Sequence, residues 1–203
     1  MQQMSSLPPD FLAQVASLEP AYLATDDPIR QSGFGGGPER WRAERGPILA
    51  AVTGAGDFLD IGCANGYLAE CLVAWAGERG IRLTPHGIDL GPRLIAEAQR
   101  RLPQFAANFH VANGWDWRPD RRFRYVYTLS DCVPQEMLRE YAGRLLDRLV
   151  EPHGRLIVGS YGSRSRATPP LPIAETLASY GYAVAGQTTG GEPLVTAFAW
   201  IDR

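Results

Sequence analysis

GDFLDIGCANGYLAEC, residues 56–71, is the stretch of this chain that decides its fold. An apolar run predicts a strand ending at Ile61, a polar turn follows, and a helix is expected from Tyr67 onward. Gly62 and Gly66 allow the backbone a tight turn and a close approach by a ligand, and the turn presents N–H groups at the start of the helix. The pattern predicts a nucleotide-binding α/β unit.

The acidic residue within this pattern separates two classes of cofactor. Dinucleotide-binding folds use three glycines to seat a pyrophosphate on the helix end. Here Ala64 replaces the middle glycine of D-x-G-x-G-x-G, and Asp60 lies at the strand end. A carboxylate there would repel a pyrophosphate and attract an amino group. Asp60 therefore favours a zwitterionic ligand such as S-adenosylmethionine.

A second acidic residue follows in the segment HGIDL, residues 86–90. Asp89 is expected at the end of the second strand, where it can accept hydrogen bonds from both hydroxyls of a ribose. The alternative is that Asp89 caps the helix predicted to begin near Pro92. The position after a strand favours ribose binding.

These motifs, in this order, resemble the class I S-adenosylmethionine-dependent methyltransferases from about residue 45 to the end of the chain. The resemblance includes the turn DIGCANGYL, the ribose acid Asp89, and the segments FHVANGWD (109–116), FRYVYT (123–128) and GRLIVGS (154–160). Ala64 is its one departure. The resemblance implies an α/β three-layer sandwich whose seven-stranded sheet is mostly parallel and has an antiparallel C-terminal hairpin strand.

The flanking segments are consistent with that architecture. Two strands, residues 182–186 and 194–200, are joined only by a turn-rich segment, which predicts a hairpin rather than a crossover. A dinucleotide dehydrogenase would instead continue with a parallel strand. Helices are predicted at residues 9–23 and 39–52. We therefore divide the chain into an N-terminal helix and glycine-rich lid segment, residues 1–44, and a catalytic core, residues 45–203.

The resemblance implies a set of cofactor contacts at the ends of the strands. Asn113 would accept a hydrogen bond from the adenine amino group. Trp115 would lie against the adenine face, or would instead be a hydrophobic anchor beneath the sheet edge. The full set of expected cofactor-binding residues is Asp60, Gly62, Cys63, Ala64, Gly66, Asp89, Leu90, Asn113, Gly114, Trp115 and Ser130.

Candidates for acceptor chemistry lie in the loops after the fourth and fifth strands. Asp131 is the candidate general base or acceptor-orienting group, and its alternative role is an ordinary cap near Pro134. Tyr161 is a candidate substrate contact. His86, His110 and His153 are expected away from the carboxyl ends of the strands, where open α/β sheets bind ligands.

Residues 27–41, DPIRQSGFGGGPERW, are unusually rich in glycine just before a predicted helix. We interpret the segment as a lid that folds over the cofactor. Phe34 or Trp41 would shield the sulfonium, and Arg40 would lie near the methionine carboxylate. The alternative is a mobile linker.

Composition limits the remaining function classes. The chain has 203 residues, 45% of them hydrophobic, and its net charge of −2 supplies no broad basic surface, so nucleic acid is an unexpected substrate. No apolar run is long enough for a membrane helix. The N-terminus shows no secretory signal, so a cytoplasmic location is predicted. Three cysteines without C-x-x-C spacing argue against disulfides and structural zinc, and no metal is expected.

The predicted function is transfer of a methyl group from S-adenosylmethionine, with S-adenosylhomocysteine as product. We expect a small-molecule acceptor, for example a specialised metabolite, because no domain is inserted between the predicted strands. The alternatives are a protein or RNA methyltransferase, and a binding module that holds the cofactor without transferring its methyl group. The sequence leaves the acceptor atom open among oxygen, nitrogen, carbon and sulfur.

Overall fold

The computed structural model describes residues 6–203. Residues 1–5, on which the prediction about a secretory signal rests, lie outside the described residues. Within the described part, a seven-stranded sheet has the order β3-β2-β1-β4-β5-β7-β6. Its strands are β1 (Gly56–Ile61), β2 (Leu83–Asp89), β3 (Phe109–Val111), β4 (Phe123–Leu129), β5 (Val150–Tyr161), β6 (Val184–Gly190) and β7 (Thr196–Asp202).

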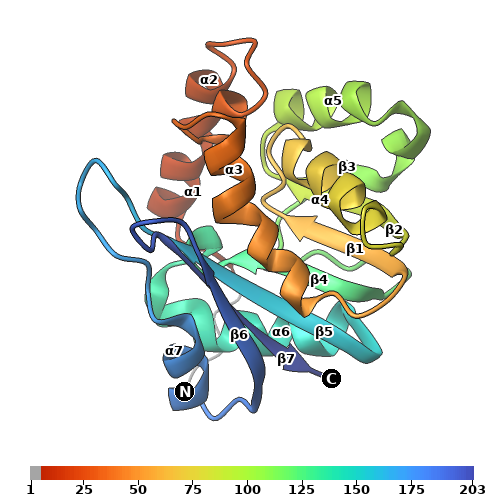
Figure 1. The fold of residues 1–203 in the computed structure, drawn as a ribbon, viewed down its shortest axis with the longest axis vertical. Helices are drawn as coiled ribbons and strands as arrows, with labels where there is room; N and C mark the ends of the chain where they lie inside the picture. The colour runs from red at the N-terminus through yellow and green to blue at the C-terminus, as the bar shows by residue number, and fades with distance from the viewer. Residues whose placement is uncertain (1–5) are drawn as a thin grey trace.

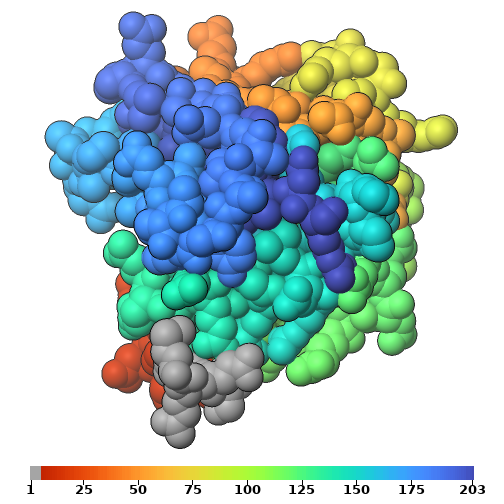
Figure 2. All heavy atoms as spheres, turned by 90° about the horizontal axis from the view of Figure 1, so that it is seen from below, coloured from red at the N-terminus to blue at the C-terminus, as the bar shows by residue number. Residues whose placement is uncertain are grey.

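The pairing of the strands confirms the predicted sheet. Strands β1 to β5 run parallel, whereas β7 pairs antiparallel with both β5 and β6. The two hairpin strands begin two residues later than the sequence suggested, and the turn between them comprises residues 191–195. Gly191 at the start of that turn has a left-handed backbone, with φ of 84°. Figure 2 shows this C-terminal part of the chain, in blue, lying across one face of the molecule.

Helices cover both faces of the sheet (Figure 1). Helices α4 (Tyr67–Gly77) and α5 (Pro92–Arg101) lie on one face, and α6 (Leu138–Arg148) and α7 (Ile173–Ser179) lie on the other. Apolar residues of the sheet are buried on both sides, among them Val126 and Leu156 toward α6 and Phe58 and Ile157 toward the opposite layer. Such burial on both faces is the usual condition of a parallel sheet.

Proline shortens both helices predicted before the first strand. Residues 9–23 form α1 (Pro9–Ala16) and α2 (Leu18–Tyr22) instead of one helix. Pro20 cannot donate to the carbonyl of Ala16, four residues earlier, so the first helix ends there. Similarly, α3 (Pro38–Arg45) passes into a 3₁₀ helix, Gly46–Ala51, where Pro47 lacks an N–H.

Candidate functional site

A cavity of about 280 Å³ lies where the carboxyl ends of the strands meet α1 and α2. Open parallel sheets bind their ligands at this edge. The strand side contributes residues that follow β1, β2, β3 and β4, and the cap side contributes the two N-terminal helices and Ser32. The lining residues are Val15, Ala16, Leu18, Glu19, Tyr22, Ser32, Ile61, Gly62, Ala64, Asp89, Leu90, Gly91, Pro92, Leu94, Ala112, Asn113, Gly114, Leu129, Asp131, Cys132 and Tyr141.

The turn after β1 forms the floor of the cavity and has a strained backbone. Gly62 and Gly66 have φ of 81° and 74°, and Ala64 has φ of 45° although it carries a Cβ. The side chain of Asn65 is fully buried and holds this turn against the N-terminal segment. Its Nδ2 donates to the carbonyl of Pro28 and to Oε1 of Gln31, both at 3.0 Å. Part of the predicted lid segment thus covers the glycine turn.

Asp89 is oriented by two backbone N–H groups. One carboxylate oxygen accepts from Ala64 at 2.9 Å, and the other accepts from Gly91 at 2.8 Å. An ionised carboxylate has about four lone-pair sites, so roughly two remain for a ligand. Burial raises the pKa of Asp89, although these two hydrogen bonds oppose the shift. Asp89 thus supports the backbone and lines the cavity, where ribose binding remains the prediction, whereas the N–H groups in the first turn of α5 are accepted by Glu19 and not by Asp89.

Asp60, predicted as a cofactor contact, is not among the residues that line the cavity and is 2% exposed. Its Oδ2 has no hydrogen-bond partner among the described residues. Burial, and then the negative charge of Asp89, raise the pKa of Asp60 to about 7. An unpaired buried carboxylate is unfavourable by itself, so this position is suited to a cationic partner.

The cap side contains two residues that sequence reasoning missed. Glu19 Oε1 accepts hydrogen bonds from the N–H groups of Arg93, at 2.7 Å, and Leu94, at 3.3 Å, in the first turn of α5. Tyr22 lies half-buried against Gly33, where an added Cβ would be 2.5 Å from the tyrosine oxygen. The local pattern of residues 9–23 does not indicate that Glu19 helps to cap the cavity. Its contacts reach α5, more than 60 residues further along the chain.

The aromatic residues predicted for the lid do not line the cavity. Phe34 and Trp41 are buried, with ring centroids 5.3 Å apart. They surround the guanidinium of Arg45, which also lies 3.5 Å from the ring centroid of Tyr161. Arg40 pairs with Glu44 at 3.3 Å. These residues therefore form a packed layer over the neighbouring part of the sheet, and the cavity is capped by α1 and α2 instead.

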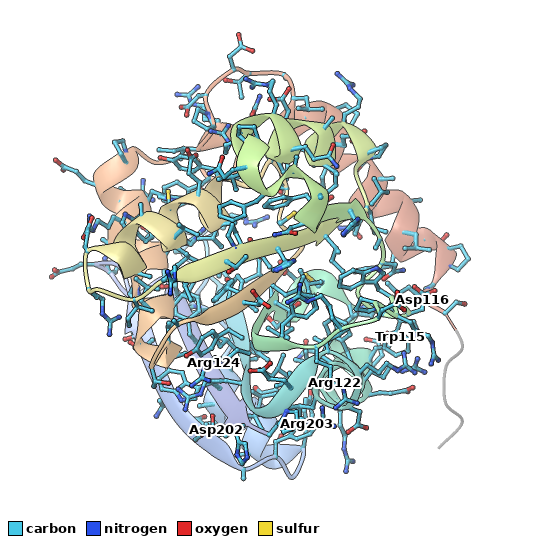
Figure 3. The ribbon with its side chains drawn as sticks, turned by 90° about the vertical axis from the view of Figure 1, so that its right-hand side faces the viewer. Trp115, Asp116, Arg122, Arg124, Asp202 and Arg203 are labelled. Carbon is cyan, nitrogen blue, oxygen red and sulfur yellow. The ribbon has the colours of Figure 1, made fainter. Side chains whose placement is uncertain are left out.

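Asn113 and Gly114 line the cavity as predicted for the segment after β3, whereas Trp115 points into the core. Trp115 is 1% exposed and stacks on Tyr141, with ring centroids 6.3 Å apart. Arg144 lies 4.1 Å from its ring centroid. The packing of Trp115 agrees with the interpretation as a hydrophobic anchor, because an indole so enclosed has no face free for an adenine. Figure 3 labels this residue.

Asp131 lines the cavity at the end of β4. The residue is exposed, but desolvation of its carboxyl group on the cavity side raises its pKa. Burial and then the charge of Asp131 raise the pKa of Tyr22, another lining residue. Cys132 also lines the cavity, and burial raises its pKa to about 12, which keeps the thiol neutral. Ser130, Cys63 and Gly66, predicted as cofactor contacts, do not line the cavity, although Ser130 and Cys63 adjoin lining residues in the sequence.

The opposite end of the sheet carries charged residues remote from the cavity. Figure 3 labels Arg122 and Arg124 at the start of β4, and Asp202 and Arg203 at the end of β7. His86 is buried inside β2, where Nε2 lies 3.6 Å from Asp57. Among residues 6–203, no three His, Cys, Asp or Glu side chains are placed to hold a metal ion, and no helix is long and apolar enough to cross a membrane.

Comparison with known proteins gives structural likeness only. No family model matches the chain, and no curated protein matches it. A Burkholderia thailandensis 1,6-didemethyltoxoflavin N1-methyltransferase with bound S-adenosylhomocysteine aligns at a TM-score of 0.66 and 14% identity, over 100% of this chain and 93% of that one. The DhpI complex with S-adenosylhomocysteine aligns at 0.59 and 20% identity, over 99% and 98%.

A third solved structure, a methyltransferase from Haloferax volcanii in complex with the Trm112 activator, aligns at a TM-score of 0.64 and 14% identity, over 93% of this chain and 96% of that one. The likeness to these structures and the observed sheet agree with the predicted seven-stranded, mostly parallel sheet that has an antiparallel C-terminal strand. The chain has the fold of the class I S-adenosylmethionine-dependent methyltransferases.

Proposed function

We propose that this protein binds S-adenosylmethionine in the cavity and transfers the methyl group to a small-molecule acceptor. The proposal rests chiefly on the position of Asp89. This residue lines the cavity at the end of β2, and two backbone N–H groups hold its carboxylate in place. A carboxylate with free lone pairs at this point of an α/β sheet suits the two hydroxyls of a ribose.

Asn113 in the lining and the buried Asp60 outside it would bind the rest of the same cofactor. The unpaired Oδ2 of Asp60 would accept a hydrogen bond from the ammonium group of the methionine part. Asn113, at the end of β3, would accept one from the adenine amino group. Gly62 and Ala64 of the turn after β1 line the cavity, so the ligand would lie against this turn.

The sulfonium of the cofactor supplies an electrophilic methyl group. The contribution of the chain is to align the acceptor with that methyl and to keep water out, which is the purpose that α1 and α2 would serve over the cavity. Asp131 would receive a proton from the acceptor, and its raised pKa makes its carboxylate a stronger base.

The cavity, of about 280 Å³, supports a small acceptor over a protein or RNA chain, since a polymer needs a longer groove. One neighbour is named for methylation of a small heterocycle, which agrees with this proposal. Another is named as a [4+2]-cyclase, at a TM-score of 0.57 and 13% identity. The alternative function is therefore that of a protein with this fold that does not transfer a methyl group.

Calorimetric titration with S-adenosylmethionine, S-adenosylhomocysteine and NAD tests the cofactor. Both sulfur ligands should bind and NAD should not. Asp89→Ala should weaken binding by roughly 10-fold or more, because hydrogen bonds to a charged group contribute about 1.5–3 kcal/mol. Glu136→Gln, which removes an exposed carboxylate outside the cavity, is the control and should bind as the unmodified chain does. Binding of NAD alone would overturn the proposal.

A further inference from the structure

Arg45, at the end of α3, is a buried cation whose hydrogen-bonding capacity is not used. Its Nη1 is enclosed and donates to no other described residue. Three aromatic rings pack around the guanidinium, but a ring face accepts no conventional hydrogen bond. A buried charge is unfavourable unless it is paired and hydrogen-bonded. The position of Arg45 is therefore suited to an anionic ligand group.

Glu44 is the carboxylate beside Arg45, and it already accepts from two other arginines. Its Oε1 lies 3.3 Å from Nη2 of Arg40 and 3.0 Å from Nε of Arg164, whereas its Oε2 is 3.8 Å from Nη1 of Arg45, too far for a hydrogen bond. The side chains of Arg40 and Arg164 are 47% and 27% exposed, so water also solvates them. That of Arg45 is 7% exposed. Among these three arginines, Arg45 is the one left without a good acceptor.

Two tyrosines connect Arg45 with Asp60. The guanidinium of Arg45 lies 3.5 Å from the ring centroid of Tyr161, whose hydroxyl oxygen is 2.6 Å from that of Tyr127. In the sheet, Tyr127 on β4 is paired in register with Asp60 on β1, and Tyr161 on β5 is paired with Thr196 on β7. Paired residues of neighbouring strands project from the same face of a sheet. These side chains therefore form one polar cluster.

The cluster contains buried polar atoms without partners. Oδ2 of Asp60 and Oγ1 of Thr196, like Nη1 of Arg45, make no hydrogen bond with the described residues. One tyrosine hydroxyl donates to the other, and the accepting hydroxyl keeps a proton that no other described residue accepts. Buried polar groups in folded proteins almost always have partners. A ligand that brings acceptor oxygens to Arg45 and the hydroxyls would supply the missing ones.

The cluster adjoins the cavity through Leu129. A Cβ added at Gly159 would lie 3.0 Å from the hydroxyl oxygen of Tyr127 and 3.1 Å from Cδ2 of Leu129, and Leu129 lines the cavity. The ring of Phe34 covers the guanidinium of Arg45 at 4.9 Å. The three residues after Phe34 are glycines, which give the backbone the freedom to move this ring.

We propose that Arg45, together with the hydroxyls of Tyr161 and Thr196, binds a carboxylate group of a ligand, and that Phe34 closes over this subsite. The inference rests on the proposed function. The planar guanidinium matches the two oxygens of a carboxylate, and one buried positive charge balances its one negative charge. The carboxylate belongs either to the methionine part of the cofactor, whose ammonium would pair with Asp60, or to the methyl acceptor.

Removal of the carboxylate from the cofactor tests the first source. Calorimetry compares S-adenosylhomocysteine with its decarboxylated analogue, S-adenosyl-3-thiopropylamine, which keeps the amino group. S-adenosylhomocysteine should bind roughly 10-fold or more tightly, because the analogue lacks a charge-assisted hydrogen-bonded pair. Arg45→Met should reduce this preference to less than about threefold. Arg42→Met, in the same helix but paired with Glu78 on the surface, is the control and should keep it.

A second pair of probes tests the acceptor as the source. Benzoate and benzyl alcohol, which are similar in size and differ in charge, are titrated into the full chain saturated with S-adenosylhomocysteine. If the acceptor carries the carboxylate, benzoate should bind roughly 10-fold or more tightly than the alcohol. Arg45→Met should abolish this preference, and Arg42→Met should not. A carboxylate preference that depends on Arg45 in either pair of probes supports the inference and identifies the source.

Tyr161→Phe keeps the inference testable where Arg45→Met fails to fold. This variant retains the ring beneath the guanidinium and removes only the hydroxyl, so it should lower the carboxylate preference. Binding of S-adenosylhomocysteine without a carboxylate preference in either pair of probes overturns the inference and leaves the proposed function standing. A preference that survives in Arg45→Met, or in Tyr161→Phe where Arg45→Met does not fold, does the same. Failure of S-adenosylhomocysteine to bind overturns both.

Discussion

Asp60 lies in the least favourable electrostatic position among the residues of the site. Its carboxyl group is buried, one oxygen is unpaired, and its pKa is raised to about 7 from 3.8. A raised acid pKa means that the folded state holds the proton more tightly than the unfolded chain. The resulting stability is fully present below about pH 4 and is lost as the pH rises through about 7. Ionised Asp60 therefore destabilises the ligand-free protein, and the cofactor ammonium that we propose as its partner would offset this cost.

The pH dependence of cofactor affinity follows from this position. An ammonium group pairs with ionised Asp60, so the affinity for S-adenosylhomocysteine should be constant above pH 7 and should fall by up to about 10-fold per pH unit below it. Calorimetry between pH 5 and 8.5 measures the dependence. In Asp60→Asn the affinity should be lower at pH 8 and nearly independent of pH. Asp57→Asn, on the same strand outside the cavity, should keep the dependence of the unmodified chain.

At the scale of elements, the cap depends on the contact between α2 and the segment that follows it. Gly33 ends a short 3₁₀ helix, Arg30–Ser32, in the left-handed conformation, with φ of 78°. The oxygen of Tyr22 occupies the space where a Cβ would lie. The neighbouring Gly35 has no such constraint, since an added Cβ would meet nothing within 4 Å.

Gly33→Ala should therefore destabilise the protein and loosen the cap, whereas Gly35→Ala should do neither. The strained backbone costs about 1–2 kcal/mol, and displacement of Tyr22 adds to it. Urea unfolding measures the stability, and limited proteolysis between residues 17 and 35 measures the opening of the cap. Equal behaviour of the two variants would show that Tyr22 does not depend on Gly33.

At the scale of the molecule, the cavity joins parts of the chain that are far apart in sequence. The cap helices supply Glu19 and Tyr22, and the core supplies Asp89, Asn113 and Asp131. Figure 1 shows α1 and α2 beside the helical layer above the sheet. A ligand in the cavity therefore contacts both cap and core, so its binding energy should stabilise the whole chain.

Saturation with S-adenosylhomocysteine should raise the melting temperature in one cooperative transition. A ligand at 100 times its dissociation constant adds about 2.7 kcal/mol. For a chain of this size that corresponds to a shift of about 5–10 °C. Differential scanning calorimetry measures the shift, and Asp89→Ala at the same ligand concentration should lose most of it. Two separate transitions, with only the later one moved by ligand, would show that the cap does not take part.

The sequence determined the features that depend on neighbouring residues. Short stretches of sequence predict these features, because the effects of glycine, proline and apolar alternation extend over only a few residues. They are the strand, turn and helix of residues 56–71, the position of Asp89 after the second strand, and the C-terminal hairpin. The resemblance then supplied the sheet. The same reasoning placed Asp89, Asn113 and Asp131 at the carboxyl ends of parallel strands, where the cavity lies.

Only the tertiary structure decided which segment covers the cavity and which aromatic rings face it. Local composition favoured the glycine-rich segment with Phe34 and Trp41, yet these rings pack around Arg45, and α1 and α2 cap the cavity instead. Trp115 likewise stacks on Tyr141 in the core. The physical reason is that the sequence around a large aromatic residue is similar whether its side chain is buried in the core or against a ligand cavity. Its partner is chosen by the free energy of packing between segments distant in sequence, which no short stretch of sequence contains.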